Sequence, residues 1–223
     1  MTSRVEPGLN RPLKLVSPPI PPRRDDFPGD DTDLVEGFRR GDPLARAALY
    51  DRYADHVHRV LYRILGFDRD LVDLHHDVFV RALVSLPNLK DPRALKGWLT
   101  MIAVHVAHAS IARRKHGGWL WFLPSDELPE VESSHAGTDV RDALRATYAI
   151  LDRLPPEERI AFALRFIDGM ELTEVAAACD TSLATIKRRL ARAAAHFDAD
   201  AQRQPALEAW VKGGARWGNP SES

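Results

Sequence analysis

Apolar residues recur at helical spacing through most of the first half of the chain. Residues 33–66 carry two such stretches that meet at Gly41-Asp42, and Pro43 suits the first position of the second helix. Two further stretches, 70–86 and 93–115, show the same period on either side of a turn-rich break at 87–92. The pattern predicts four helices that pack into a compact all-α domain.

Helical spacing resumes in the second half and ends in a basic helix. Periodic stretches are expected from Asp139 to the Pro155-Pro156 pair, and from there to Gly169. Residues 172–197 then divide into two helices around a tight turn at 179–181, which is typical of a helix-turn-helix. Asp33 is the expected N-cap of the first helix of the chain. Thr173 and Ser182 are the expected N-caps of the two helices of the helix-turn-helix.

The last helix separates apolar from basic side chains. Its expected buried stripe is Leu183, Ile186, Leu190, Ala194 and Phe197. The opposite side gathers Thr185, Arg188, Arg189 and Arg192, with Lys187 at the border. A solvated surface helix has the same pattern, but the preceding capped helix and short turn favour a helix that enters a major groove.

Three segments lack this periodicity. Residues 1–31 are rich in proline and are expected to form a disordered or extended tail, and 117–138 form an acidic linker that also holds exposed aromatics. These aromatics either pack back onto the first domain or lie against another molecule. The fold class is therefore all-α, with helical domains at 32–116 and 139–199, a flexible linker between them, and a C-terminal extension at 200–223. Within that extension the segment 207–212 is a candidate amphipathic anchor that docks on the same molecule.

Composition narrows the possible classes of protein. The net charge of −1 requires that any nucleic-acid binding come from local basic patches. One cysteine excludes an intramolecular disulfide and a cysteine-based zinc cluster. The absence of a long apolar run and of a signal-peptide core predicts a cytoplasmic protein with no membrane insertion.

The order of these parts resembles the bacterial sigma-70 family, in its compact extracytoplasmic-function (ECF, group IV) form. The resemblance covers roughly residues 32–199. In the first half it rests on the residues Asp33-Leu34-Val35, Gly41-Asp42, Leu49-Tyr50, Arg52-Tyr53, Asp73-Leu74-His75-His76-Asp77-Val78-Phe79, Trp98-Leu99 and Ile102-Ala103. In the second half it rests on Leu154-Pro155-Pro156-Glu157-Glu158-Arg159, Leu164-Arg165-Phe166, Gly169-Met170, Glu174-Val175-Ala176 and the run from Thr185 to Ala193.

The resemblance implies a factor that binds core RNA polymerase, directs it to promoters and helps to melt the −10 element, without covalent chemistry. It implies no enzyme activity and no cofactor or metal. The first domain would be sigma region 2 and the second sigma region 4. The implied partners are the β′ clamp helices and β flap of core polymerase, promoter DNA, and an anti-sigma factor that covers the polymerase-binding surfaces.

Site residues follow from the same resemblance and agree with the residue chemistry. The residues expected to contact the β′ clamp helices are Asp73, His76, Asp77, Phe79 and Val80. Those expected at the melted −10 strand are Asn88, Leu89, Lys90, Arg93, Trp98, His105, Arg113 and Arg114. Those expected at the −35 duplex are Ser182, Thr185, Lys187, Arg188, Arg189 and Arg192.

Five positions depart from the family pattern. His76-Asp77 replaces the usual Gln-Glu pair, which shortens the reach toward polymerase. His105 stands where many relatives have asparagine, and Arg188 where serine is common, so the base preferences of the family do not carry over. Asp180 replaces a turn glycine, which aspartate tolerates in the left-handed region.

Two other classes of protein fit part of the sequence. A plain transcription regulator would explain the helix-turn-helix but neither the basic, aromatic fourth helix nor the acidic linker; it would bind duplex promoter DNA without polymerase. Nine histidines raise the possibility of a metal protein or enzyme, but His105 and His108 lack the accompanying glutamate of a zinc hydrolase. A metal-content measurement distinguishes that class.

Overall fold

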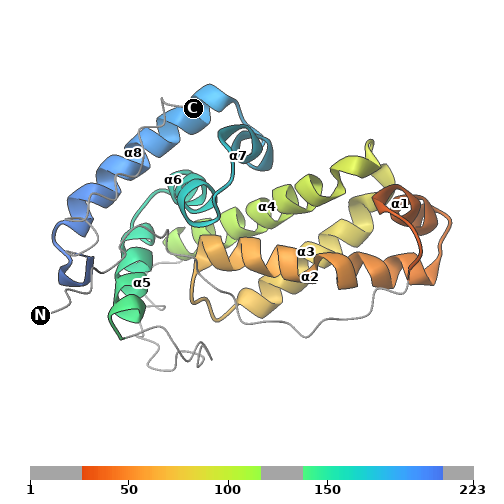
Figure 1. Cartoon of the computed structure of the whole chain (residues 1–223), viewed down its shortest axis with the longest axis horizontal. Coiled ribbons are helices and arrows are strands. Elements are labelled where there is room, and N and C mark those ends of the chain that lie inside the picture. The colour runs from red at the N-terminus through yellow and green to blue at the C-terminus, as the bar shows by residue number, and fades with distance from the viewer. Residues whose placement is uncertain (1–26, 117–137, 208–223) are drawn as a thin grey trace, which may run out of the picture.

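A computed structural model describes residues 27–116 and 138–207, and all regular structure in these ranges is helical (Figure 1). The rest of the expected tail, the linker 117–137 and the segment from residue 208 onward lie outside the described residues. In the described ranges no helix combines the length and the apolar character that a membrane crossing requires. The all-α fold class is confirmed.

The first half forms the four expected helices. They are α1 (Asp31–Arg39), α2 (Pro43–Leu65), α3 (Leu71–Ser85) and α4 (Leu95–His116). Two short 3₁₀ turns, η1 (Leu86–Asn88) and η2 (Pro92–Ala94), replace the expected break and the expected first turn of the fourth helix. The second half contains α5 (Thr138–Leu151), α6 (Pro156–Phe162), the five-residue π-helical turn η3 (Ala163–Ile167), α7 (Leu172–Ala178), α8 (Leu183–Ala201) and the 3₁₀ turn η4 (Pro205–Leu207).

Two of the expected caps are wrong and one is confirmed. The α1 cap is Asp30, whose carboxylate accepts from the amides of Thr32 and Asp33, so Asp33 is the third helical residue of a capping box. The α7 cap is likewise Glu171, which is paired with Glu174, and not Thr173. Each helix therefore begins with a capping box, in which the cap residue and an acidic residue three positions later pair with each other's backbone amides. Ser182 caps α8 as expected.

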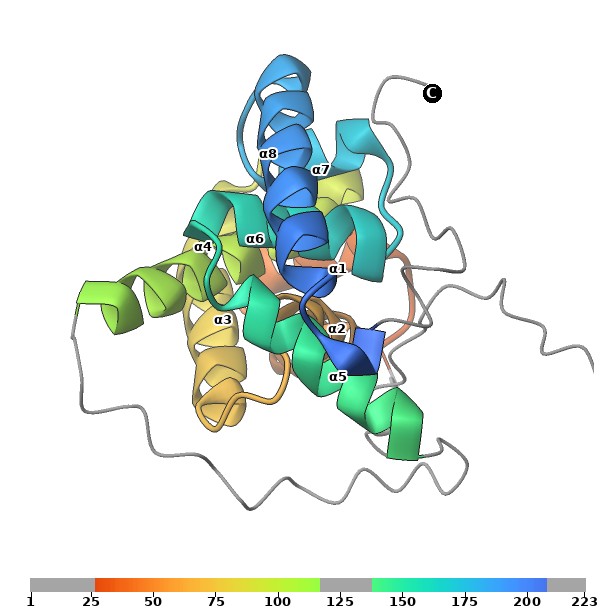
Figure 2. The same cartoon turned by 90° about the vertical axis from the view of Figure 1, so that its left-hand side faces the viewer.

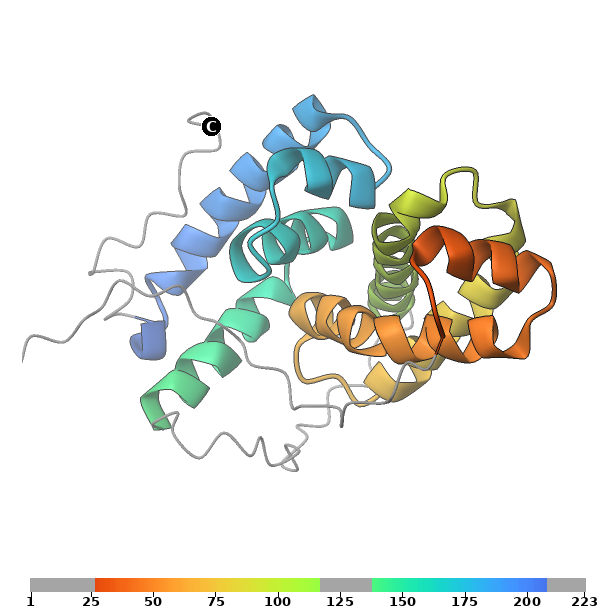
Figure 3. The same ribbon diagram turned by 45° about the vertical axis from the view of Figure 1, so that its right-hand side comes forward.

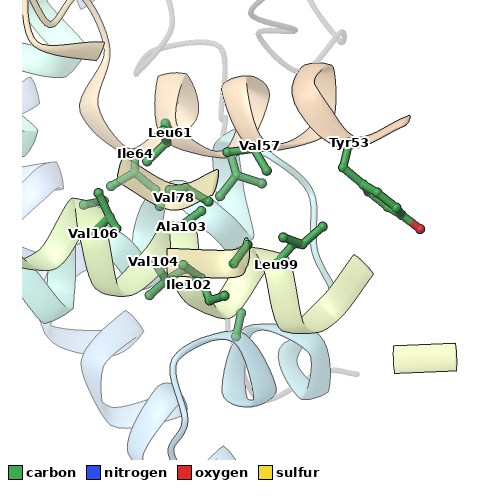
Figure 4. Packing of buried hydrophobic residues seen from close by; sticks show 14 of the residues in the cluster. Tyr53, Val57, Leu61, Ile64, Val78, Leu99, Ile102, Ala103, Val104 and Val106 are labelled. Atoms are coloured by element: carbon green, nitrogen blue, oxygen red, sulfur yellow. The ribbon is translucent and has the colours of Figure 1, made fainter. Parts of the chain in front are cut away.

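The core of the first half lies where α2, α3 and α4 face one another. Val57, Leu61 and Ile64 of α2 meet Val78 of α3 and the apolar side of α4 in this layer (Figure 4). The buried His75 of α3 adds a polar anchor, because its Nε2 lies 3.0 Å from the carbonyl oxygen of Ala54.

The second half has its own smaller core. Phe162 of α6 stacks on Phe197 of α8, with ring centroids 4.8 Å apart, and both rings are fully buried. Leu207 in η4 is buried in the same cluster, which holds the start of the C-terminal extension on the second half. The rest of the expected anchor segment lies outside the described residues.

The two halves are packed against each other, which the sequence pattern did not predict. Helix α6 lies between α8 and α4, and α7 packs on α4 (Figures 2 and 3). Val104 of α4 belongs to one continuous apolar cluster with Ile160 of α6 and Val175 of α7. The buried surface of α4 therefore serves both halves.

Candidate nucleic-acid and polymerase interfaces

Helices α7 and α8 form the expected helix-turn-helix. The turn closes through the amide of Thr181, which donates to the carbonyl of Ala176 at 3.0 Å. Asp180 has a φ of 46°, so the residue that replaces the usual turn glycine adopts the left-handed conformation. The buried stripe of α8 is Ile186, Leu190, Ala193, Phe197 and Ala201, which corrects the expected Leu183 and Ala194. Leu183 lies in the first turn of α8 and is 39% exposed.

The residues expected to read the −35 duplex do not share one environment. Arg188 is exposed and, within the described ranges, forms no ion pair. Lys187 is half-buried, and the hydroxyl of Thr185 lies 2.9 Å from that of the capping Ser182. These residues, with Ser182 exposed at the helix start, form the open part of the face that a major groove would meet.

Arg192 and Arg189 have neighbours in other helices, although the side chain of Arg192 remains 55% exposed. The Nε of Arg192 lies 2.8 Å from Oε1 of Glu158, whose side chain is only 6% exposed. The second oxygen of Glu158 lies 3.3 Å from Nδ1 of His196. Arg189 lines a crevice of about 200 Å³ with His105 and His108 of α4. The sequence pattern gave no sign of Glu158, because a buried acid in the first turn of α6 looks like an ordinary dipole partner.

A shallow hollow separates the N-terminal end of α6 from the exposed face of α8. Its volume is about 410 Å³ and it is lined by Pro155, Glu157, Glu158, Thr185, Arg188, Arg189 and Arg192. The arginines would attract a phosphate backbone, and the two glutamates oppose it. The carboxylates therefore restrict where on this face an anion can lie.

The turns before α4 carry four of the eight residues expected at the −10 strand. Asn88, Lys90 and Arg93 are exposed, whereas Leu89 is buried in the core. Arg39 of α1 holds this loop in place: its guanidinium donates to the carbonyls of Leu89 at 2.5 Å and of Pro87 at 3.3 Å. Nothing in the spacing of the sequence indicated this role for Arg39, because it bridges elements far apart in the chain.

The remaining −10 candidates are spread along α4. Trp98 is half-buried at its N-terminal end, His105 is exposed in its middle, and Arg113 is exposed near its C-terminal end. Arg114 is held by carboxylates, with Nη2 2.5 Å from Asp68 and 3.4 Å from Asp70. Arg114 therefore fixes the turn between α2 and α3 in addition to adding positive charge.

Trp98 faces a large cleft at the boundary between the two halves. The cleft has a volume of about 990 Å³, and its first-half wall includes His56, Arg59, Arg63 and Lys96. His56 Nε2 lies 2.8 Å from the hydroxyl of Thr100. Burial, together with the charges of Lys96 and Arg59, lowers the pKa of His56 to about 4, so the ring is neutral at neutral pH. The opposite wall comes from the second half and includes Phe166, Met170 and Ala177.

Helix α3 presents the residues expected to bind polymerase, with one correction. Asp73, His76 and Val80 are exposed, and Asp77 pairs with Arg81 one turn later at 3.0 Å. Phe79 is buried, with its ring 4.8 Å from Tyr50, because its position faces α2. The exposed face instead carries apolar side chains outside the expected set, namely Val72, Leu83 and Val84. The exposed fractions are 77% for Val72 and 75% for Val84, so this face is uncovered.

No group of three or more metal-ligating side chains occurs in the described part of the chain. Three of the described histidines have partners within the protein: His56 Nε2 lies 2.8 Å from the hydroxyl of Thr100, His75 Nε2 lies 3.0 Å from the carbonyl oxygen of Ala54, and His108 Nε2 lies 3.1 Å from Oε1 of Glu157. These contacts give His56, His75 and His108 structural roles.

Comparison with known proteins matches both halves to one family. Residues 49–117 match the model "Sigma-70 region 2" and residues 144–197 match "Sigma-70, region 4". Together the two models cover more than half of the chain, and the match to region 2 accounts for the half that a stand-alone helix-turn-helix regulator leaves unexplained.

The individual relatives that match this chain are also named as sigma factors. The ECF RNA polymerase sigma factor SigE of Mycolicibacterium smegmatis is 32% identical over 154 residues, which cover 65% of this chain and 56% of that protein. The RNA polymerase sigma-H factor of Pseudomonas aeruginosa and the ECF RNA polymerase sigma-E factor of Escherichia coli are each 25% identical over 177 residues, covering 75% of this chain and 92% of each relative.

A solved structure supports the fold. The structure of CnrH in complex with the cytosolic domain of CnrY matches with a TM-score of 0.53 and 23% sequence identity, over 76% of this chain and 95% of that one. The two halves thus match sigma-70 region 2 and region 4 in that order along the chain. The chain belongs to the sigma-70 family, in its extracytoplasmic-function group.

Proposed function

We propose that this chain is a promoter-specificity subunit: it binds core RNA polymerase and directs initiation at promoters that carry its own −35 and −10 sequences. The observation that carries the proposal is the match of α2–α4 to region 2 and of α5–α8 to region 4 on one chain. Such a factor needs no cofactor and performs no covalent chemistry, and it acts in the cytoplasm where chromosomal promoters are.

At the −35 element, α8 enters the major groove with Arg188 as its principal base reader. Arg188 is exposed and free to place both guanidinium nitrogens on a guanine edge, a contact worth roughly 1–3 kcal/mol of discrimination. Arg192 joins it with its orientation set by Glu158, because its Nε lies 2.8 Å from that buried carboxylate while the side chain remains 55% exposed. Ser182 and Lys187 are placed for phosphates at the groove edge.

At the −10 element, the loop before α4 and the N-terminal part of α4 hold the melted strand. Asn88 offers amide groups to a base edge, and Lys90 and Arg93 neutralise phosphates. Trp98 supplies an aromatic face for stacking, and His105 lies two turns further along α4. Because Leu89 is buried, we propose that it supports the loop and does not contact a base.

The uncovered face of α3 docks on the β′ clamp helices. It combines the apolar side chains Val72, Val80 and Val84 with the polar His76 and Asp73. An exposed apolar face rimmed by polar groups is typical of a protein-binding surface. We further propose that an anti-sigma factor covers this face when the chain is inactive, in line with the solved complex of CnrH with the cytosolic domain of CnrY.

Binding to a forked promoter duplex with and without core polymerase tests the proposal. Fluorescence anisotropy of DNA that carries a −35 duplex and a single-stranded −10 segment is measured with the chain alone, core alone, and both. We expect sequence-specific binding only when both are present. Equally tight, specific duplex binding by the chain alone would indicate a plain helix-turn-helix regulator and overturn the proposal.

A further inference from the structure

Arg39 on α1 contacts the backbone on both sides of Asn88. Its Nε donates to the carbonyl of Pro87 at 3.3 Å, and its Nη2 donates to the carbonyl of Leu89 at 2.5 Å. The first carbonyl belongs to the peptide group that precedes Asn88, and the second to the peptide group that follows Leu89. One guanidinium therefore joins two points of the same turn. Figures 1 and 3 show α1 beside the turns that lead into α4, and the two pack together.

The peptide group between Asn88 and Leu89 is held by a third hydrogen bond. The amide of Leu89 donates to the carbonyl of Leu86 at 3.0 Å, which closes η1. Leu86 and Leu89 are both buried, so each end of the turn is anchored in the core. Each residue has only two soft backbone angles, and the peptide groups on both sides of Asn88 are held. The direction in which the exposed Asn88 side chain leaves the turn is therefore fixed.

Arg39 can hold the turn because the end of α1 is itself well defined. Leu34 is fully buried beneath this helix, and Phe38 is 9% exposed. The amide of Gly41 donates to the carbonyl of Phe38 at 3.0 Å, and Gly41 has a φ of 81°, so the helix ends in a sharp turn. Helix α1 lies before residues 49–117, which match the region 2 model. Its contact with the turn is a feature of this chain that the family match does not describe.

The next turn has an anchor of its own. The carboxylate of Asp91 accepts from the amide of Arg93 at 3.1 Å, and the amide of Ala94 donates to the carbonyl of Asp91 at 3.0 Å. This cap places Arg93, which is proposed to contact phosphates, without any help from Arg39. Loss of the Arg39 side chain should therefore disturb Asn88 and leave the phosphate contacts in place.

We propose that Arg39 is a positioning residue for −10 recognition: by holding the turn around Asn88 it sets the base preference of that side chain without touching DNA. The preference rests on the proposed function, because it assumes that Asn88 reads a base of the melted strand. The hold on the turn does not, and it is measurable in the protein alone. Hydrogen bonds to a base edge weaken steeply as their angles depart from linear. A loosened turn thus loses base preference before it loses binding.

Four variants separate positioning from charge. Arg39→Met keeps the length of the side chain and removes its donors, whereas Arg39→Lys keeps the charge and loses the planar fork that reaches two carbonyls. Asn88→Ala removes the proposed reader. Arg40→Met is the matched control, because the guanidinium of Arg40 is exposed and pairs with Glu36 of the same helix at 3.7 Å. Circular dichroism and thermal unfolding establish that each variant is folded.

Hydrogen exchange of the Leu89 amide measures the hold on the turn in the free protein. We expect Arg39→Met to raise the exchange rate about two- to tenfold, as for the loss of one hydrogen bond that supports a local structure. Arg40→Met should exchange at the parent rate. An unchanged rate in Arg39→Met would show that Arg39 does not hold the turn, and would overturn the inference.

Base preference is measured with the reconstituted holoenzyme on forked promoter duplexes that carry each of the four bases at each −10 position. We expect Asn88→Ala to lower the preference at one position about fivefold or more. Arg39→Met and Arg39→Lys should lower it at the same position, and Arg40→Met should not. Arg39→Met combined with Asn88→Ala should lose no more preference than Asn88→Ala alone, because the two residues act through one contact.

The contrary outcomes are distinct. Weaker binding of Arg39→Met to all bases alike, with a salt dependence reduced by about one charge, would place Arg39 on a phosphate and overturn the positioning role. A preference that is lost in Asn88→Ala but kept in Arg39→Met would overturn it as well. If Asn88→Ala keeps every preference, Asn88 is not the reader and the inference falls with it. If the parent holoenzyme shows no −10 preference at all, the proposed function fails, and faster exchange in Arg39→Met still shows that Arg39 holds the turn.

Discussion

Arg188 and Arg192 are two arginines of α8, but their guanidinium groups have different surroundings. Arg188 has no carboxylate partner within the described ranges, whereas Arg192 is fixed by the buried Glu158. The helical period predicted that both lie on the basic face of α8. It could not predict the ion pair, because Glu158 lies in another helix and its burial depends on the packing of α6 on α8.

Replacement of Arg188 by alanine separates base reading from charge. We expect Arg188→Ala to relax sequence preference at one base pair of the −35 element, with a loss of about 1–3 kcal/mol of discrimination. Lys187→Ala is the matched control: it should weaken binding about equally for all sequences and reduce the salt dependence by about one charge. Holoenzyme binding to a panel of −35 variants at several salt concentrations measures both. Uniform weakening by Arg188→Ala would place Arg188 on a phosphate.

His56 makes stability depend on pH. Its pKa falls from 6.5 in the unfolded chain to about 4 in the folded one, so the unfolded state takes up the proton first. The stability that the neutral ring contributes is present above pH 6.5 and is lost as pH falls toward about 4. Because His56 is partly exposed, we expect about 1–3 kcal/mol over this range.

Urea unfolding at several pH values checks this expectation. His56→Gln keeps a donor for Thr100 and removes the titration, so its unfolding free energy should fall less between pH 6.5 and 4 than that of the parent. His58 and His75, whose pKa values burial also lowers, remain in both proteins and contribute equally. Identical pH dependence in the two proteins would contradict the role of His56.

At the scale of elements, helical spacing predicted each helix and most of its buried face. The errors concerned the caps of α1 and α7, the buried stripe of α8 and the exposed face of α3. The capping boxes begin at Asp30 and Glu171, because a side chain three residues on completes each box. Leu83 of α3 is apolar and yet 39% exposed, since α3 packs on α2 and α4 along a narrower face than its apolar residues cover. The excess apolar surface is the part available to a partner.

A charge on this face should block polymerase without unfolding the protein. We expect Val80→Glu to weaken binding to core polymerase at least about tenfold, as for a charge placed in a desolvated interface. Leu44→Glu is the control, because Leu44 is an exposed apolar residue of α2 outside the α3 face. Titration of labelled core polymerase measures affinity, and thermal unfolding should show that both variants remain folded. Unchanged affinity of Val80→Glu would move the polymerase contact away from α3.

At the scale of the whole molecule, the sequence predicted two helical units in the right order but not their contact. Periodicity shows that Val104 and Ile160 lie on apolar faces, but it does not show that each covers the other. The same holds for Arg159. The sequence shows that it lies in a family motif, but only the fold shows that its guanidinium donates to carbonyls at the end of α2. Contacts between residues about a hundred positions apart depend on docking, and no local pattern determines docking.

Promoter-specific initiation by the reconstituted holoenzyme tests the central claim most directly. The chain is combined with core RNA polymerase on a library of genomic promoter fragments, and transcript 5′ ends are sequenced. We predict start sites that require the chain, share one −35 and one −10 sequence, and lose the −35 preference at one base pair with Arg188→Ala. Transcripts that are the same with and without the chain, for every compatible core enzyme, would contradict its assignment as a promoter-specificity subunit.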